Sequence, residues 1–176
     1  MNISSTSLFQ SVPHLVIALV MMASWGCSPS EDQLLFEQEA FSAPSGFTET
    51  NDRGIVARKD PDDWRVGPMF YRLITINPIY PNPTKGADLR LQVYIERNEG
   101  IFGLEIVRID TRYVPVRYIP LYRNAQAPLP PGIMNINIPF SIIFPQYPGL
   151  DERGLHRILV LDSRQNVISY GDIKLE

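Results

Sequence analysis

The chain of 176 residues has one cysteine and two histidines, so few side chains are available for metal binding, disulfide formation or nucleophilic chemistry. One cysteine can form neither a disulfide framework nor a cysteine-based zinc finger. A basic excess is also missing, because the formal net charge is -3, and a nucleic-acid partner is therefore not expected. His14 lies before the single cysteine, and His156 begins a predicted strand beside Arg157, where a structural role is the commoner one.

Catalytic sequence motifs are absent as well. The chain contains no G-x-S-x-G elbow, no H-E-x-x-H helix, no Walker A loop and no G-x-G-x-x-G turn. No spacing singles out two of the 19 acidic residues as a glycosidase pair. The Asp60–Trp64 stretch lacks the glycine and terminal glutamate of an EF-hand calcium loop. The sequence therefore predicts a protein that is not an enzyme and that uses no cofactor and no metal.

Charged residues are missing from the first 26 positions, and the apolar run Leu15–Ala23 lies among them. A membrane-spanning helix needs about 20 apolar residues. A run of roughly half that length is typical of the apolar region of a secretory signal peptide. Small residues Ser24 and Gly26 come directly before Cys27. The sequence therefore predicts a signal peptide over residues 1–26.

Ser24-Trp25-Gly26-Cys27 resembles the lipobox of bacterial lipoproteins, in which small residues precede an invariant cysteine. The resemblance implies cleavage between Gly26 and Cys27, a diacylglyceryl group on the Cys27 thiol, and acylation of the new amino group, for example with palmitate. Several acyl chains give stable membrane anchoring. From the residues alone, a buried free thiol or an uncleaved anchor remains open.

The acidic stretch after Cys27, with Ser30, Glu31 and Asp32, resembles the export signals that send lipoproteins of Bacteroidota-like bacteria to the outer face of the outer membrane. The resemblance implies a cell-envelope protein that is lipid-anchored to the outer membrane and exposed at the surface. The same residues also fit a helix start, because Ser30 and Gln33 have the spacing of a capping box ahead of an apolar run. The two interpretations are compatible.

Residues 27–68 lack sustained periodicity and are predicted to be a lipid-anchored, irregular tether with short helical turns. Within it we expect helical turns over 34–41 and a small hairpin over 47–58. Asp60 is expected to cap one helical turn that begins with Pro61. Trp64 is then expected to pack as an anchor on the domain that follows.

Residues 69–176 have the pattern of a β domain. In Asp88–Glu96 apolar and polar residues alternate strictly, which predicts one face on a core and one in water, as in antiparallel sheets. Pro139 favours an edge position for its strand, and Gly171 is expected to mark a bulge. About seven short strands predict an all-β, Ig-like antiparallel β-sandwich, with a small barrel as the alternative. The further strands are expected over 70–76, 102–110, 114–121, 134–142, 156–161 and 167–170.

The segment Tyr80–Gly86, YPNPTKG, directly precedes the best strand. It resembles the start of the C-terminal sorting domains of type IX secretion cargo in Bacteroidota, which are also small β-sandwiches. The resemblance implies a secretion-linked sorting or docking role. The residues alone predict a rigid turn into the strand, because prolines fix φ and Gly86 allows the chain to turn.

A partner face is predicted around Arg117, Tyr118, Tyr122 and Arg123, because Tyr and Arg are favoured at interface hot spots. A packed core covered by arginine stems is the alternative. The sequence as a whole predicts a non-catalytic, lipid-anchored envelope protein with a protein partner, acting as a binding or accessory module of an outer-membrane assembly. A sorting or docking domain, and a carbohydrate-active or carbohydrate-binding surface lipoprotein, are the alternatives.

Overall fold

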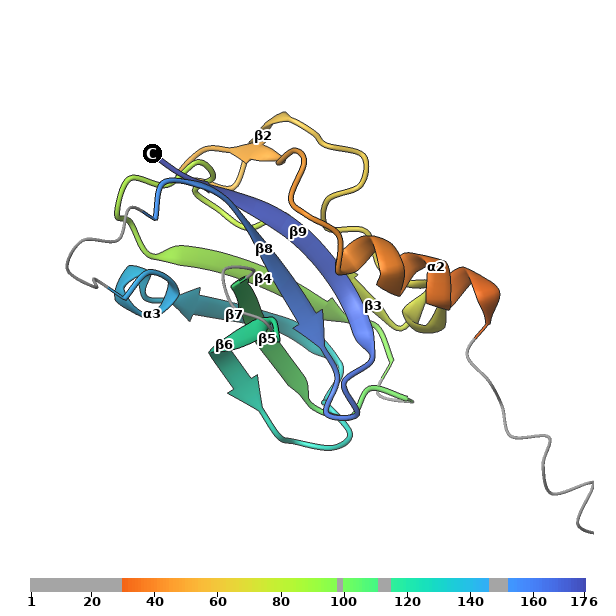
Figure 1. Cartoon of the computed structure of the whole chain (residues 1–176). Coiled ribbons are helices and arrows are strands. Elements are labelled where there is room, and N and C mark those ends of the chain that lie inside the picture. The colour runs from red at the N-terminus through yellow and green to blue at the C-terminus, as the bar shows by residue number, and fades with distance from the viewer. Residues whose placement is uncertain (1–29, 98–99, 111–114, 146–151) are drawn as a thin grey trace, which may run out of the picture. The chain divides into compact units, whose positions relative to one another are not determined.

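The computed structural model describes residues 30–97, 100–110, 115–145 and 152–176. The predicted signal peptide over residues 1–26 and the predicted lipid attachment at Cys27 lie outside these residues. Residues Glu31–Glu176 pack as one compact unit, which contains the two antiparallel sheets of a sandwich and a smaller two-stranded sheet (Figure 1). Among the described residues, no helix has the length and hydropathy needed to cross a membrane.

The two sheets together contain seven strands. One sheet has the order β3-β4-β7, with β3 at Ile74–Ile76, β4 at Leu89–Ile95 and β7 at Gly132–Ile138. The other has the order β6-β5-β8-β9, with β6 at Arg117–Asn124, β5 at Leu104–Asp110, β8 at Gly154–Leu161 and β9 at Val167–Leu175. Leu91, Ile106 and Val160 belong to one core cluster that both sheets line. The predicted all-β antiparallel sandwich is therefore confirmed.

The two sheets differ in how their outer faces are covered. In β4 the apolar positions are buried and Arg90 and Tyr94 are exposed, as the alternation predicts. In β9 eight of the nine residues are buried, because the helix α2 (Glu31–Ala40) covers the outer face of this sheet (Figure 1). Phe36 and Ala40 of α2 form a second core cluster with residues of β5, β8 and β9. The four-stranded sheet is thus covered on its outer face over β5, β8 and β9, and the three-stranded sheet has an open face.

The predicted tether must be corrected, because the compact unit begins at Glu31 and includes residues 31–68. Helix α2 forms where helical turns were expected, and β1 (Glu49–Thr50) pairs with β2 (Val56–Arg58) as the expected hairpin. A short helix η1 (Pro68–Phe70) follows. The segment also packs on the distant strand β9, where the Phe36 ring lies 5.2 Å from the Tyr170 ring, and no local periodicity reveals such a contact.

Trp64 anchors this N-terminal segment as predicted. Its exposed fraction is 4%, and its backbone N–H donates to the carbonyl of Tyr170 at 2.7 Å. The indole lies against Gly171, where a Cβ atom would overlap the ring. The predicted bulge at Gly171 is wrong, because Gly171 pairs in regular register with Ile158. Close approach of the indole, and not a kink, explains this glycine.

The expected turn at Asp60 is present, although it is a non-helical turn: the Asp60 carboxylate accepts the N–H of Asp62 at 3.1 Å. The strand expected to run to Ile142 ends at Ile138 instead. Pro139 follows, and the short helix α3 (Phe140–Ile143) begins directly after it. Pro139 therefore ends the strand, because it has no N–H to give to a ladder.

Asn82, in the middle of the YPNPT segment, is fully buried and links two distant parts of the chain by hydrogen bonds. Its Nδ2 group donates to the carbonyls of Thr48 and Asp172, both at 2.9 Å. Its Oδ1 atom accepts the N–H of Lys174 at 2.9 Å. Its backbone N–H and C=O pair with Thr50. One amide thus joins the N-terminal segment to β9.

Replacing Asn82 by Ala is expected to lower the free energy of unfolding by about 2–5 kcal/mol, because three buried backbone groups lose their partner. Urea denaturation at fixed pH measures this as a shift of the midpoint. Asn77→Ala is the matched control, because the Asn77 side chain is exposed and bonds only to Gln92. If Asn77→Ala lowered the free energy of unfolding as much as Asn82→Ala, this would contradict the proposed linking role of Asn82.

Candidate functional site

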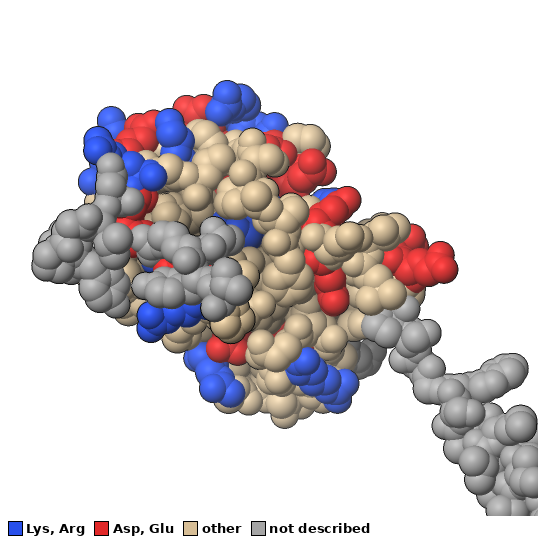
Figure 2. All heavy atoms as spheres, in the orientation of Figure 1, with Lys and Arg blue, Asp and Glu red and all other residues tan. Residues whose placement is uncertain are grey.

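The acidic residues near the predicted anchor lie at the start of α2. Glu31 and Asp32 are exposed in the first turn of the helix, where negative charge is favourable. Figure 2 shows acidic side chains over the α2 end of the unit and basic ones gathered near β2 and the C-terminus. Ser30 is exposed directly before the helix. Their proposed role in export stays a prediction.

The predicted partner face on β6 is not one face. Tyr122 lies opposite Ile106 and packs against the core. Tyr118 and Arg123 lie on the other side of the strand, while Arg117 is on the same side as Tyr122. Adjacent residues of a strand point to opposite sides, so these four residues cannot share one face. The register shift between Ile106 and Val107 decides which of them lie together on each side.

His156 is held by neighbours on both ring nitrogens. Its Nε2 atom lies 2.6 Å from the carbonyl oxygen of Glu152, which can only accept, so Nε2 carries the proton. Arg108 Nη1 lies 3.2 Å from Nδ1 and can only donate to it. The ring also packs edge-on against Phe144, with centroids 4.7 Å apart. This geometry is that of a structural histidine.

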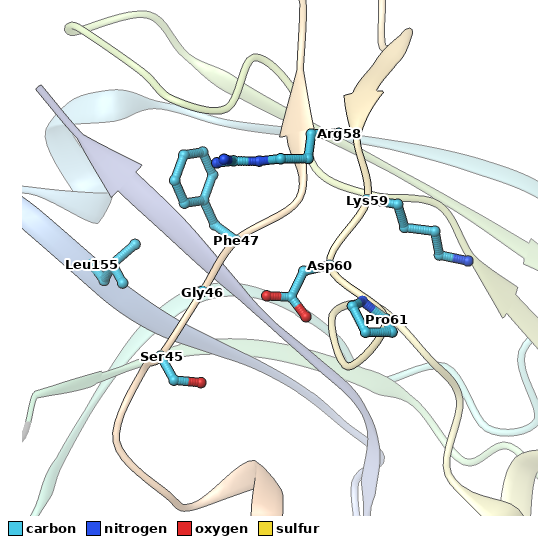
Figure 3. A pocket seen from close by; sticks show the side chains of 8 residues that line it. All are labelled: Ser45, Gly46, Phe47, Arg58, Lys59, Asp60, Pro61 and Leu155. Carbon is cyan, nitrogen blue, oxygen red and sulfur yellow. The ribbon is translucent and has the colours of Figure 1, made fainter.

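A hollow of about 460 Å³ lies between the end of β2 and the start of β8 (Figure 3). Its lining residues are Ser45, Gly46, Phe47, Arg58, Lys59, Asp60, Pro61 and Leu155. The Arg58 guanidinium lies over the Phe47 ring, 5.3 Å from its centroid. The Asp60 carboxylate is held by the turn that it caps. Within the described residues, no cluster of three or more His, Cys, Asp or Glu side chains could hold a metal ion.

Asp63 is buried and joins Thr48 of the N-terminal segment to Asp172 of β9. Its carboxylate accepts the N–H of Thr48 at 2.6 Å and the N–H of Asp172 at 2.9 Å. Burial raises the pKa of Asp63 to about 7, although the two backbone hydrogen bonds favour the ionised form and oppose this rise. The nearby carboxylates of Asp172 and Asp60 raise the pKa further. Asp63 is therefore a titrating group inside a structural network.

The open face of the three-stranded sheet carries a row of amide side chains. Asn77 Nδ2 donates to Gln92 Oε1 at 2.8 Å, and Gln92 Nε2 donates to Asn135 Oδ1 at 3.0 Å. The row crosses the sheet, because Gln92 lies opposite Asn135 in the register of β4 and β7. We call these three residues the amide row. It is uncharged, ordered by its own hydrogen bonds, and exposed at both ends.

Larger side chains flank the amide row on the same face. Tyr94 and Ile133 lie opposite each other on one side, with exposed fractions of 46% and 62%. On the other side Tyr80, Arg90 and Asn137 border a hollow of about 200 Å³. Amides, a guanidinium and tyrosine rings offer hydrogen bonds and flat contact area, which are common features of recognition surfaces.

Sequence reasoning missed this site. The alternation of β4 places Gln92 and Tyr94 on the solvent face, but it does not say which strands lie beside β4. The amide row depends on the pairing of β4 with β7, whose members are more than forty residues apart in the chain. The open face could therefore be found only once the sheet order was known.

No protein-family model matches the chain, and no curated protein matches it. Among solved structures, a crystal structure of a candidate lipoprotein from Bacillus anthracis matches with a TM-score of 0.43 and 10% sequence identity. The match covers 86% of this chain and 99% of the other. A likeness of this degree assigns neither a family nor a function.

The raised pKa of Asp63 predicts a stability contribution that falls as pH rises. The folded state binds the Asp63 proton below pH about 7, whereas an unfolded aspartate loses it near pH 4. The contribution is thus complete below pH about 4 and is lost as pH rises through 7. For this reason the free energy of unfolding is expected to fall by on the order of 2 kcal/mol between pH 5 and 8.

Urea denaturation of the unmodified chain and of Asp63→Asn at several pH values measures this contribution. Asp63→Asn is expected to be less stable than the unmodified chain at pH 5, because its amide cannot accept both N–H groups. The difference between their free energies of unfolding should narrow toward pH 8. A difference that is constant with pH would show that Asp63 does not titrate in this range.

Proposed function

We propose that the chain is a non-catalytic, lipid-anchored envelope protein whose β-sandwich is a binding module, with the open face of β3-β4-β7 as its binding surface. The partner is a protein of an outer-membrane assembly. The amide row and the flanking residues Tyr80, Arg90 and Tyr94 make the contact.

The observation that carries the binding role is the difference between the two sheets. The chain covers the outer face of β5, β8 and β9 with its own helix α2 and buries Phe36 there. It leaves the outer face of β3-β4-β7 open, with Tyr94 and Ile133 about half exposed. Tyrosine and arginine are enriched at interface hot spots, which supports a protein partner. An amide row held in place by its own hydrogen bonds loses little side-chain entropy on binding.

The anchor is supported by the signal-peptide pattern and by the lipobox-like residues that end at Cys27. The acidic residues Glu31 and Asp32 support outer-membrane placement with surface exposure. The buried structural role of Asn82 supports a folding function for the YPNPT segment and does not itself point to sorting. These features favour the binding module over the sorting domain.

Location is tested with the intact chain and Cys27→Ala in a native-like host. Fractionation should place the unmodified chain in the outer membrane and the variant in the soluble fraction. Protease treatment of whole cells should remove the unmodified chain if it faces outward. A soluble unmodified chain would falsify the anchor, and a membrane-bound but protected chain would place it on the periplasmic side.

The binding surface is tested by photo-crosslinking from position 94 in cells, with position 71 as the control. Tyr94 and Tyr71 are both exposed tyrosines, but Tyr94 lies on the central strand of the open face, whereas Tyr71 follows η1 and belongs to none of its strands. We expect a defined protein product from position 94 and none from position 71. Tyr94→Ala and Gln92→Lys should each weaken recovery of that partner, whereas Tyr71→Ala should not. Equal products from both positions would argue against the open face as the binding surface.

A further inference from the structure

The strand β7 presents unused backbone groups along the edge of its sheet. Arg90 exchanges both backbone hydrogen bonds with Tyr80, so its peptide groups point away from β7. The neighbouring residue Leu91 therefore bonds to Ile136, which lies opposite it. By the same alternation, the N–H and C=O groups of Ile133, Asn135 and Asn137 point outward. Among the described residues, nothing donates to these groups or accepts from them.

This edge is also unprotected by charge. β7 has the sequence GIMNINI, without a charged residue and without proline. The other edge strands are protected against pairing with a further strand. β6 contains two arginines and Pro120, and β3 has only three residues. The outer edge of β9 is covered by bridges from Val66 and Thr84. Long, uncharged edges are the ones that pair with another strand.

We propose that β7 pairs antiparallel with β7 of a second copy of this chain, so that two three-stranded sheets become one six-stranded sheet. The pairing is symmetric about Asn135, which lies opposite Asn135 of the partner subunit. Ile133 then lies opposite the partner's Asn137, and Asn137 opposite the partner's Ile133. The three outward-facing residues of each copy supply about six backbone hydrogen bonds.

A second copy is favoured over an unrelated strand because the edge matches itself. Its uncharged residues create no repulsion when two copies meet, whereas a charged edge would repel itself. The amide row also continues across the junction. Asn135 already accepts from Gln92, which leaves its amide N–H groups for the partner's Asn135. The open faces of the two copies then lie side by side and form one larger surface.

The pairing is independent of the proposed partner, and it is expected to be weak in dilute solution. A strand-to-strand contact buries less than the roughly 800 Å² per partner of a standard interface. Confinement of both copies to one surface raises their effective concentration and favours the pair.

Cysteine crosslinking of the full chain tests the pairing. Asn135→Cys places two thiols opposite each other at a Cα separation of about 5.5 Å, which suits a disulfide. Thr75→Cys is the matched control, because Thr75 is exposed on the same face but at the opposite edge, on β3. In membranes of the expressing host, mild oxidation should give a 135–135 linked dimer, identified by mass spectrometry. The amount of linked dimer from Thr75→Cys should be at least about tenfold smaller.

A charge exchange tests the symmetry. Asn135→Lys and Asn135→Asp each place like charges opposite each other, and each should weaken self-association of the purified full chain in detergent roughly tenfold or more. An equal mixture of the two variants should restore it, because opposite charges then meet across the junction. Thr75→Lys should leave self-association unchanged.

Sedimentation velocity over a range of concentrations measures the association, and circular dichroism checks that each variant is folded. The proposal is supported by position-specific crosslinking together with rescue in the mixture. It is overturned if the unmodified chain stays monomeric at all concentrations, in which case the edge is left to a foreign strand. It is also overturned if Asn135→Cys and Thr75→Cys crosslink equally, or if Asn135→Lys still dimerises.

Discussion

The buried ion pair of Arg157 and Asp172 holds the N-terminal segment on the sandwich. The Arg157 guanidinium donates to the Asp172 carboxylate and, through Nη1, to the last carbonyls of α2 at Glu39 and Ala40, both at 3.0 Å. It also lies over the Tyr170 ring, 4.7 Å from its centroid. A positive charge at a helix C-terminus is favourable, and this one satisfies carbonyls that a helix end leaves without partners.

Asp172 connects this pair to the rest of the segment. Its backbone N–H donates to Asp63, and its carbonyl accepts from Asn82. Loss of one member of a buried pair leaves an uncompensated charge, at a cost of about 3–5 kcal/mol. The helix, the hairpin region and the YPNPT segment therefore depend on one residue of β9. Without this junction, the outer face of the four-stranded sheet would lose its cover.

The sequence predicts the features that rest on local patterns. The alternation of β4 follows directly from its residues, and so does the sandwich, because each strand needs one apolar face. The extent of the folded unit could not be predicted, because α2 has only three buried residues and the β8 and β9 residues that hold it lie more than a hundred positions away. The four residues proposed as a partner face on β6 cannot share one face, because adjacent residues of a strand point to opposite sides. A register shift that the sequence does not reveal places Arg117 on the same side as Tyr122. The amide row was missed because three strands must be ordered before their outward residues can be compared.

The start of the folded unit at Glu31 limits how far an anchored molecule could reach. Only residues 28–30 separate it from Cys27, and three extended residues span about 10 Å. A lipid on Cys27 would therefore be joined to the folded unit by a short linker and not by a long flexible one. The sandwich would stay close to the bilayer surface and could not move far away from it. Such a molecule meets partners that are themselves embedded in, or resting on, the same membrane.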